Sequence, residues 1–200
     1  MFGKEIIEVA IKEIAKTPTE VLAQKKSLHE TFTSSFTSKE GMFTGRSHDN
    51  GNEIWTLTFE EKCMIARETG WSSEVINSIA NMDQYNIYKN AKLHEVEING
   101  RKCLCKDIDY DYVDPKTGKT NRELMADGRS PIDSKTGEKI ELHHMGQKYD
   151  APLCELCENS EHGDDNHVIL HPEKSSWRQD KVLNNRFNNT DRPNYWKNRV

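Results

Sequence analysis

Long apolar runs are absent from this chain of 200 residues. No stretch approaches the ~20 consecutive apolar residues that a transmembrane helix needs, which excludes that kind of integral membrane protein. The N-terminal stretch MFGKEIIEVAIKEIAKTPTE carries charges throughout its apolar run, so it does not form a Sec-type signal peptide. We therefore expect no membrane partner and a cytoplasmic site of action.

An even set of cysteines is also absent. The chain has five cysteines, and an odd number in a chain of this size argues against a disulfide framework. Cys103-x-Cys105 and Cys154-x-x-Cys157 leave open a four-thiolate zinc site. The first pair lies on a strand-like run, however, where alternate residues share a face, so packing in the core is the preferred interpretation. Cys63 is expected to be buried in a helix.

A positive net charge is missing too. The formal charge is −5 and the pI is about 5.9, which does not by itself indicate a nucleic-acid-binding protein. The distribution is uneven, because the residues from Pro172 onward include seven basic and three acidic side chains, a net of +4. The acidic excess lies upstream, mostly between Glu53 and Glu97.

Three regions are distinguishable along the chain, and together they predict an α+β protein. Residues 1–52 comprise a helical segment from Gly3 to about Glu30 and a linker rich in Ser, Thr and Gly. Residues 53–117 contain helices and a β-hairpin around Asn99–Gly100. Residues 118–200 hold a short helix from Asn121 to Ala126 and the strand IELHH.

Local signals inside the middle region are specific enough to predict helix ends. Thr58 and Glu61 fit a capping box, and Gly70 is a stop signal for the helix that Thr58 begins. Ser72 is a suitable N-cap for a second helix. A third short helix is predicted around Tyr85–Tyr88.

Histidines supply the densest chemical signal in the sequence. Five of the eight fall within residues 143–171, at positions 143, 144, 162, 167 and 171. His143 and His144 end the predicted strand and so point to opposite faces, which allows one to bind a metal and the other to face a water molecule. His167 and His171 are four apart, and on a helix they would share one face. Imidazoles suit zinc, nickel and similar ions.

These residues carry a resemblance to a known group of enzymes. ELHH at 141–144, GQ at 146–147, PLCEL at 152–156, EH at 161–162 and LH at 170–171 together resemble the LHH branch of the HNH/endonuclease VII superfamily. GKTNRELMADGRSP at 118–131 is also similar to such chains. The resemblance implies a ββα-metal (His-Me finger) nuclease core in residues 118–200, with an accessory helical and hairpin region before it.

The resemblance also implies roles for individual residues. His143 is expected to be a metal ligand, His144 the general base and His171 the last ligand, around one divalent ion per site: zinc, nickel or magnesium. An Asn usually supports the base, and Asn166 is preferred over Asn159 for that role. Glu141 either braces an imidazole or is an exposed strand residue.

The remaining ligand is open between His162 and His167. The family pattern favours His162, whereas simple helical spacing favours His167. Val168 and Ile169 are weak helix formers, and Pro172 disfavours α geometry at His171. We therefore predict that the helix begins at ENSEH rather than in HVILH, and that His162 is the ligand.

Hydrolysis of DNA phosphodiester bonds with low sequence specificity is the activity that follows. Lys119, Arg122, Arg178 and Lys197 are the candidate contacts to nucleic acid. By resemblance the chain is a bacterial toxin effector, secreted or delivered into a target cell without a Sec signal peptide and paired with an immunity protein. The alternatives are a phage or housekeeping HNH nuclease, and a non-catalytic, metal-stabilised module that binds DNA or protein.

Overall fold

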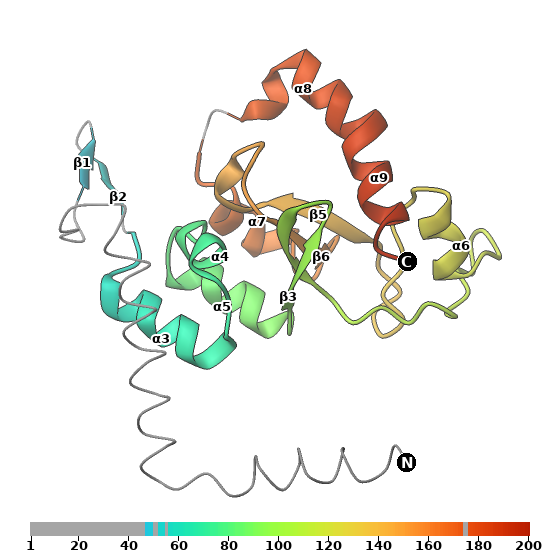
Figure 1. Cartoon of the computed structure of the whole chain (residues 1–200), viewed down its shortest axis with the longest axis horizontal. Helices are drawn as coiled ribbons and strands as arrows, with labels where there is room; N and C mark the ends of the chain where they lie inside the picture. The colour runs from blue at the N-terminus through green and yellow to red at the C-terminus, as the bar shows by residue number, and fades with distance from the viewer. Residues whose placement is uncertain (1–46, 50–51, 55, 174–175) are drawn as a thin grey trace, which may run out of the picture. The chain divides into compact units, whose positions relative to one another are not determined.

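The computed structural model describes residues 47–49, 52–54, 56–173 and 176–200 (Figure 1). Helices and a small sheet alternate along these residues, so the fold is α+β. The helix predicted for residues 3–30 lies outside the described residues. Strands β1 (Ser47–Asp49) and β2 (Asn52–Ile54) form an antiparallel pair, which was not predicted for the end of the linker.

Three capped helices follow, as the sequence predicts. Helix α3 (Phe59–Thr69) begins with the Thr58–Glu61 capping box and ends at Gly70 with a left-handed φ of 73°. Helix α4 (Ser73–Asn77) is capped by Ser72, and helix α5 (Met82–Asn90) by Asn81. In each case the N-cap side chain accepts a hydrogen bond from a backbone N–H that the helix leaves without a partner.

One four-stranded sheet joins the middle and C-terminal regions of the chain. Its strands are β3 (His94–Ile98), β4 (Arg101–Cys105), β5 (Ile140–His144) and β6 (Leu153–Cys157), in the order β3-β4-β6-β5. β3 and β4 form the predicted hairpin, with Asn99 and Gly100 both at positive φ. β4 pairs with β6 in parallel and β6 with β5 antiparallel. Residues 53–117 therefore contribute two strands to the sheet that contains the histidines.

The two faces of this sheet are covered by different elements. On one face, Leu142 and Leu153 belong to a buried cluster with Phe187 and Trp196, which come from the last third of the chain. On the other face, Cys154 is fully buried against Tyr88 of α5. Because side chains alternate along a strand, consecutive residues of β5 and β6 enter different environments.

The C-terminal helices cover the first face. They are α8 (Lys181–Arg186), a π-helical turn η3 (Phe187–Asp191) and α9 (Arg192–Lys197), preceded by a 3-10 turn η2 (Trp177–Gln179). Helix α7 (Asp164–Leu170) follows β6, and a 3-10 turn η1 (Met145–Gln147) follows β5. Helix α6 (Asn121–Ala126) has the predicted bounds and a capping box between Thr120 and Glu123.

Asn121 explains part of the sequence motif that precedes the strand IELHH. Its side chain is fully buried, donates hydrogen bonds to the carbonyls of Asp109 and Ile132, and accepts one from the Ile132 N–H. A turn lies on each side of it, and each turn begins with an aspartate, Asp114 or Asp133. The carboxylate of each aspartate accepts hydrogen bonds from backbone N–H groups two or three residues later. Asn121 thus fixes the chain that leads into β5.

A buried ion pair ties the end of the chain to the centre of the sheet. Glu155 of β6 is fully buried, and its carboxylate accepts hydrogen bonds from Arg199 at 3.0 Å, from the Tyr195 hydroxyl at 2.8 Å and from the backbone N–H of Lys106 at 2.8 Å. Arg199 also donates to the Lys106 carbonyl. A buried charge is tolerated only when it is paired and hydrogen-bonded in this way.

Removal of this guanidinium should destabilise the protein strongly. Arg199→Ala leaves the Glu155 carboxylate buried without its counter-ion, and breaking such a pair costs about 3–5 kcal/mol. We expect a loss of that size in the free energy of unfolding, measured by urea denaturation. Arg192→Ala, at an exposed arginine of the same C-terminal region, should change it by less than about 0.5 kcal/mol. Equal effects of the two substitutions would contradict the role of the pair.

Candidate metal centre

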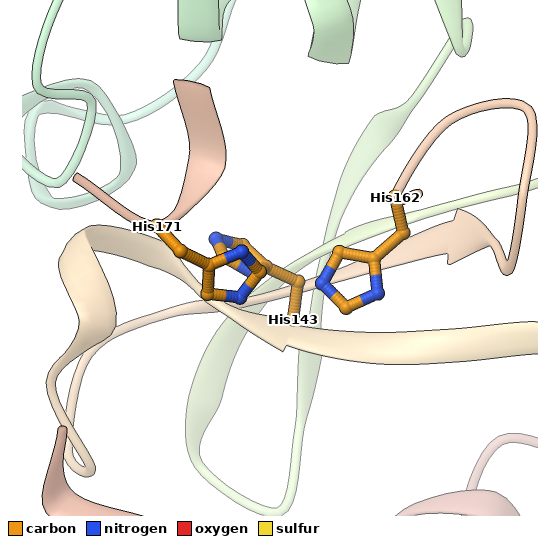
Figure 2. Close-up of side chains that lie close together, drawn as sticks. All are labelled: His143, His162 and His171. Carbon is orange, nitrogen blue, oxygen red and sulfur yellow. The ribbon is translucent and has the colours of Figure 1, made fainter. Parts of the chain in front are cut away.

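Three histidines from separate elements lie together at one edge of the sheet (Figure 2). His143 comes from the end of β5, His162 from the turn before α7, and His171 from the residue after α7. One ring nitrogen from each lies within 4.8 Å of the others. Among the residues that the structure describes, this is the one group of His, Cys, Asp and Glu side chains able to hold a metal ion.

The hydrogen bonds of these rings leave one nitrogen of each available for a ligand bond. The Nδ1 of His162 lies 3.0 Å from Glu141 Oε2, and the Nδ1 of His171 lies 3.1 Å from the carbonyl oxygen of His167. The Nε2 atoms of His143 and His162 are buried and have no hydrogen-bond partner in the described part of the chain. A buried polar atom without a partner is costly, and metal-binding imidazoles characteristically donate their other N–H to a carboxylate or carbonyl. The donor set therefore fits a divalent ion.

Burial keeps the imidazoles of His143 and His171 neutral, which is the form that binds a metal. Burial, followed by the proximity of His162 and His171, holds the pKa of His143 well below its ordinary value. Burial also lowers the pKa of His171. The hydrogen bond from His162 is the main cause that lowers the pKa of Glu141 to about 2, so this carboxylate remains charged beside the cluster.

His144 lies on the other face of the sheet, apart from the three clustered histidines. Its ring centroid is 4.6 Å from that of Trp177, 4.6 Å from that of Phe187 and 6.1 Å from that of Tyr149. It is only 4% exposed, and none of the described residues forms a hydrogen bond with its Nε2. Burial, with smaller effects of Arg101 and Arg178, lowers the pKa of His144 to about 3.

Arg178 is the one predicted nucleic-acid contact whose charge acts on these histidines. Its guanidinium lies 4.7 Å from the ring centroid of Trp177 and 5.1 Å from that of Phe187. Its positive charge contributes to lowering the pKa of His143, His144 and His171. Within the described part of the chain Arg178 forms no ion pair, and its hydrogen bond is to Asn184 at 3.3 Å.

The other three predicted contacts lie elsewhere. Lys119 is paired with Asp127 at 2.6 Å, and Lys197 acts on that same carboxylate. Arg122 is 3.8 Å from Asp111. These side chains belong to α6, its approach and α9, and the structure does not bring them to the histidine cluster.

The local structure around His167 corrects one prediction. HVILH lies in α7 except for His171, so the helix does not begin at ENSEH, which forms a turn. His171 has left the helix, with φ −124° and ψ 60°, as the following proline requires. The His167 ring stacks on that of His171 at 4.4 Å but does not belong to the three-histidine group.

Asn166 does not support His144 in this structure. Its side-chain amide donates to the carbonyls of Ser160 and Glu161, at 3.4 and 3.2 Å, and so stabilises the turn that carries His162. No hydrogen bond between Asn166 and His144 is found among the described residues. The prediction failed because α7 begins at Asp164, so that Asn166 faces the preceding turn.

The five cysteines are buried. All five are free thiols, and those on β4 and β6 pack within the sheet, as preferred from the sequence. They form no metal-binding group in the described part of the chain. Gln147 forms hydrogen bonds with Glu173, and the sequence signal for it is its place in the motif GQ.

A β-hairpin followed by a helix, with imidazoles at the end of its first strand and on both sides of the helix, defines the ββα-metal class of nuclease fold. Residues 120–200 match the LHH family model, described as a nuclease of the HNH/ENDO VII superfamily with conserved LHH. In the matched part of the chain, the LHH is Leu142-His143-His144. No solved structure matches the chain.

Substitution of His162 and of His167 tests which of the two is the third ligand. His162→Ala removes an orphaned Nε2 from the cluster and should weaken zinc binding by roughly 10- to 100-fold or more. His167→Ala should have a smaller effect, because His171 is bonded to the backbone carbonyl of residue 167 and not to its ring. Calorimetric titration of both variants decides between them. Tight binding retained in His162→Ala but lost in His167→Ala would reverse the assignment.

A second expectation concerns pH. The pKa of His144 is about 3 in the folded protein and 6.5 ordinarily, so between these values the unfolded chain binds a proton that the folded protein does not. The metal-free protein should therefore lose stability as the pH falls below 6.5. His144→Asn should remove about 1.4 kcal/mol of that loss per pH unit. Urea denaturation from about pH 7 to about pH 4 measures the slope, and identical slopes would show that His144 is hydrated.

Proposed function

We propose that this nuclease is a metal-dependent endonuclease that hydrolyses phosphodiester bonds of DNA. The observation that carries the proposal is the cluster of His143, His162 and His171, with its unpartnered nitrogens, inside a domain of the LHH family. Three nitrogen donors favour zinc or nickel over magnesium, which prefers oxygen ligands. When bound, such an ion supplies Lewis acidity toward a phosphodiester oxygen.

His144 is the proposed general base. Its Nε2 has no partner among the described residues, and burial lowers its pKa to about 3, so the imidazole is unprotonated at neutral pH and gains basicity once water reaches it. His143 and His144 face different sides of the sheet, but β5 is an edge strand that ends at His144. A phosphate lying across this strand end can contact both sides. Trp177 and Phe187 nearly cover His144, so cleavage requires displacement of Trp177.

Arg178 is the proposed phosphate contact. Its guanidinium has no carboxylate partner among the described residues and acts on histidines of both sides, so it offers a positive charge where the phosphate would lie. Contacts to phosphate position the nucleic acid but carry no sequence information. Low sequence specificity follows. With a net charge of −5, affinity for DNA should be modest and should fall as salt rises.

A toxin role with a cognate immunity protein is also proposed. It rests on the resemblance to modules that form the C-terminal part of bacterial polymorphic toxins, and cleavage of DNA with low specificity suits it. A phage or housekeeping nuclease is the alternative role. Among the described residues no helix is long and apolar enough to cross a membrane.

A plasmid-nicking assay tests the activity. We expect nicking that a chelator abolishes, and we expect His144→Asn to lower its rate by at least about 100-fold, the scale of a lost general base. Zinc affinity should remain close to that of the wild type, because His144 is outside the cluster. A variant that nicks at nearly the normal rate would exclude His144 as the base.

Two comparisons make this experiment more specific. Arg178→Gln should weaken DNA binding more than Lys119→Gln, since Lys119 is already paired with Asp127.

Growth of bacteria that express the wild type or His144→Asn tests the toxin role. A wild-type protein that binds zinc and DNA but never cleaves would favour the alternative, a non-catalytic binding module.

A further inference from the structure

His171 directly follows a helix and has an irregular backbone conformation, with φ −124° and ψ 60°. Helix α7 ends at Leu170, and the last carbonyls of a helix have no partner within it. Among the described residues, the hydrogen-bond partner of the His171 ring is the carbonyl oxygen of His167, which lies 3.1 Å from Nδ1. Contacts from outside α7 are therefore needed to hold the segment around His171 in place.

One such contact comes from Gln84, in the part of the chain before the family match. Its side chain is fully buried, and its Nε2 donates to the carbonyl of Ile169 at 2.9 Å. Its Oε1 accepts from the Ala80 N–H at 3.0 Å. Both ends of the amide are thus used, and the carbonyl two residues before His171 is anchored to the start of α5.

A second contact comes from Gln147 and reaches the residue two positions after His171. The Oε1 of Gln147 accepts from the Glu173 N–H at 2.7 Å, and its Nε2 donates to the Glu173 carbonyl at 3.3 Å. Gln147 has a φ of 55°, a left-handed conformation that non-glycine residues rarely adopt. Strain of this kind persists where surrounding contacts favour it, and it occurs often at functional sites.

We propose that Gln84 and Gln147 are positioning residues for the metal site, which hold the peptide units on either side of His171 so that its ring reaches His143 and His162. The inference rests on the proposed metal-binding role of His171. Ligands held in place before the ion arrives bind it more tightly, because less conformational entropy is lost on binding. Gln147 couples the strand that carries His143 to the segment that follows His171.

Substitution of Gln147 by glycine separates positioning from general stability. Gln147→Gly removes the two bonds to Glu173 and also relieves the positive φ, so we expect the urea midpoint of the metal-free protein to stay the same or rise. Zinc affinity, measured by calorimetry, should nevertheless fall by about 10-fold or more. A purely structural role predicts the reverse, a lower midpoint with unchanged affinity.

Lys92→Gly is the matched control. Lys92 is exposed, has the same φ of 55° and lies in the turn after α5, so its substitution relieves similar strain and should leave zinc affinity unchanged. Gln84→Met, which keeps the length of the buried side chain but removes its hydrogen bonds, should also weaken zinc binding. Because Gln84 is buried, the zinc affinity of Gln84→Met is compared with that of the wild type only after the variant is shown to unfold cooperatively.

The outcomes distinguish this inference from the function on which it rests. Zinc binding by the wild type and equally tight binding by Gln147→Gly would overturn the positioning role alone. A wild-type protein that binds no zinc would overturn both the metal site and the positioning role. Weaker binding by Gln147→Gly with normal binding by Lys92→Gly supports the inference.

Discussion

Strand β6 is the constraint on which the rest of the structure depends. It pairs with β4 on one side and β5 on the other, and all five of its residues are buried. Its central Glu155 is a buried charge that Arg199 must neutralise, which brings the end of the chain back to the sheet. The turn that follows is fixed as well, because Glu161 accepts from the Cys157 N–H and is paired with Lys106. His162 comes directly after this glutamate.

The division of the sheet into two faces shapes the chemistry at its edge. Cys154 lies opposite His143 and Leu153 lies opposite His144. Each histidine therefore lies on the same face of the sheet as the β6 residue opposite it. One face brings the imidazoles of His143, His162 and His171 together, while the other surrounds His144 with aromatic rings. The same alternation that separates their environments gives them different ionisation behaviour and different proposed roles.

Much of the local structure was predictable, because the signals for it are short-range. The capping boxes at Thr58 and Thr120 and the turn at Asn99–Gly100 depend on residues that are neighbours in sequence, and the structure confirms them. The start of α7 was predicted wrongly, since weak helix propensity at Val168 and Ile169 was outweighed by the packing of the helix against α5 and η1. Ion pairing of Lys119 and Arg122 with nearby carboxylates also required the fold to be known.

The sequence by itself indicated the family model that residues 120–200 match, the candidate histidines and the ends of α3 and α6, because these signals are short motifs. Only the tertiary structure decided which histidines meet. His143, His162 and His171 converge because a strand, a turn and a helix end are packed together, and His167 is left outside because His171 leaves the helix before Pro172. The glutamine contacts on either side of His171 likewise join residues 85 and 26 positions apart, a separation that no local pattern encodes.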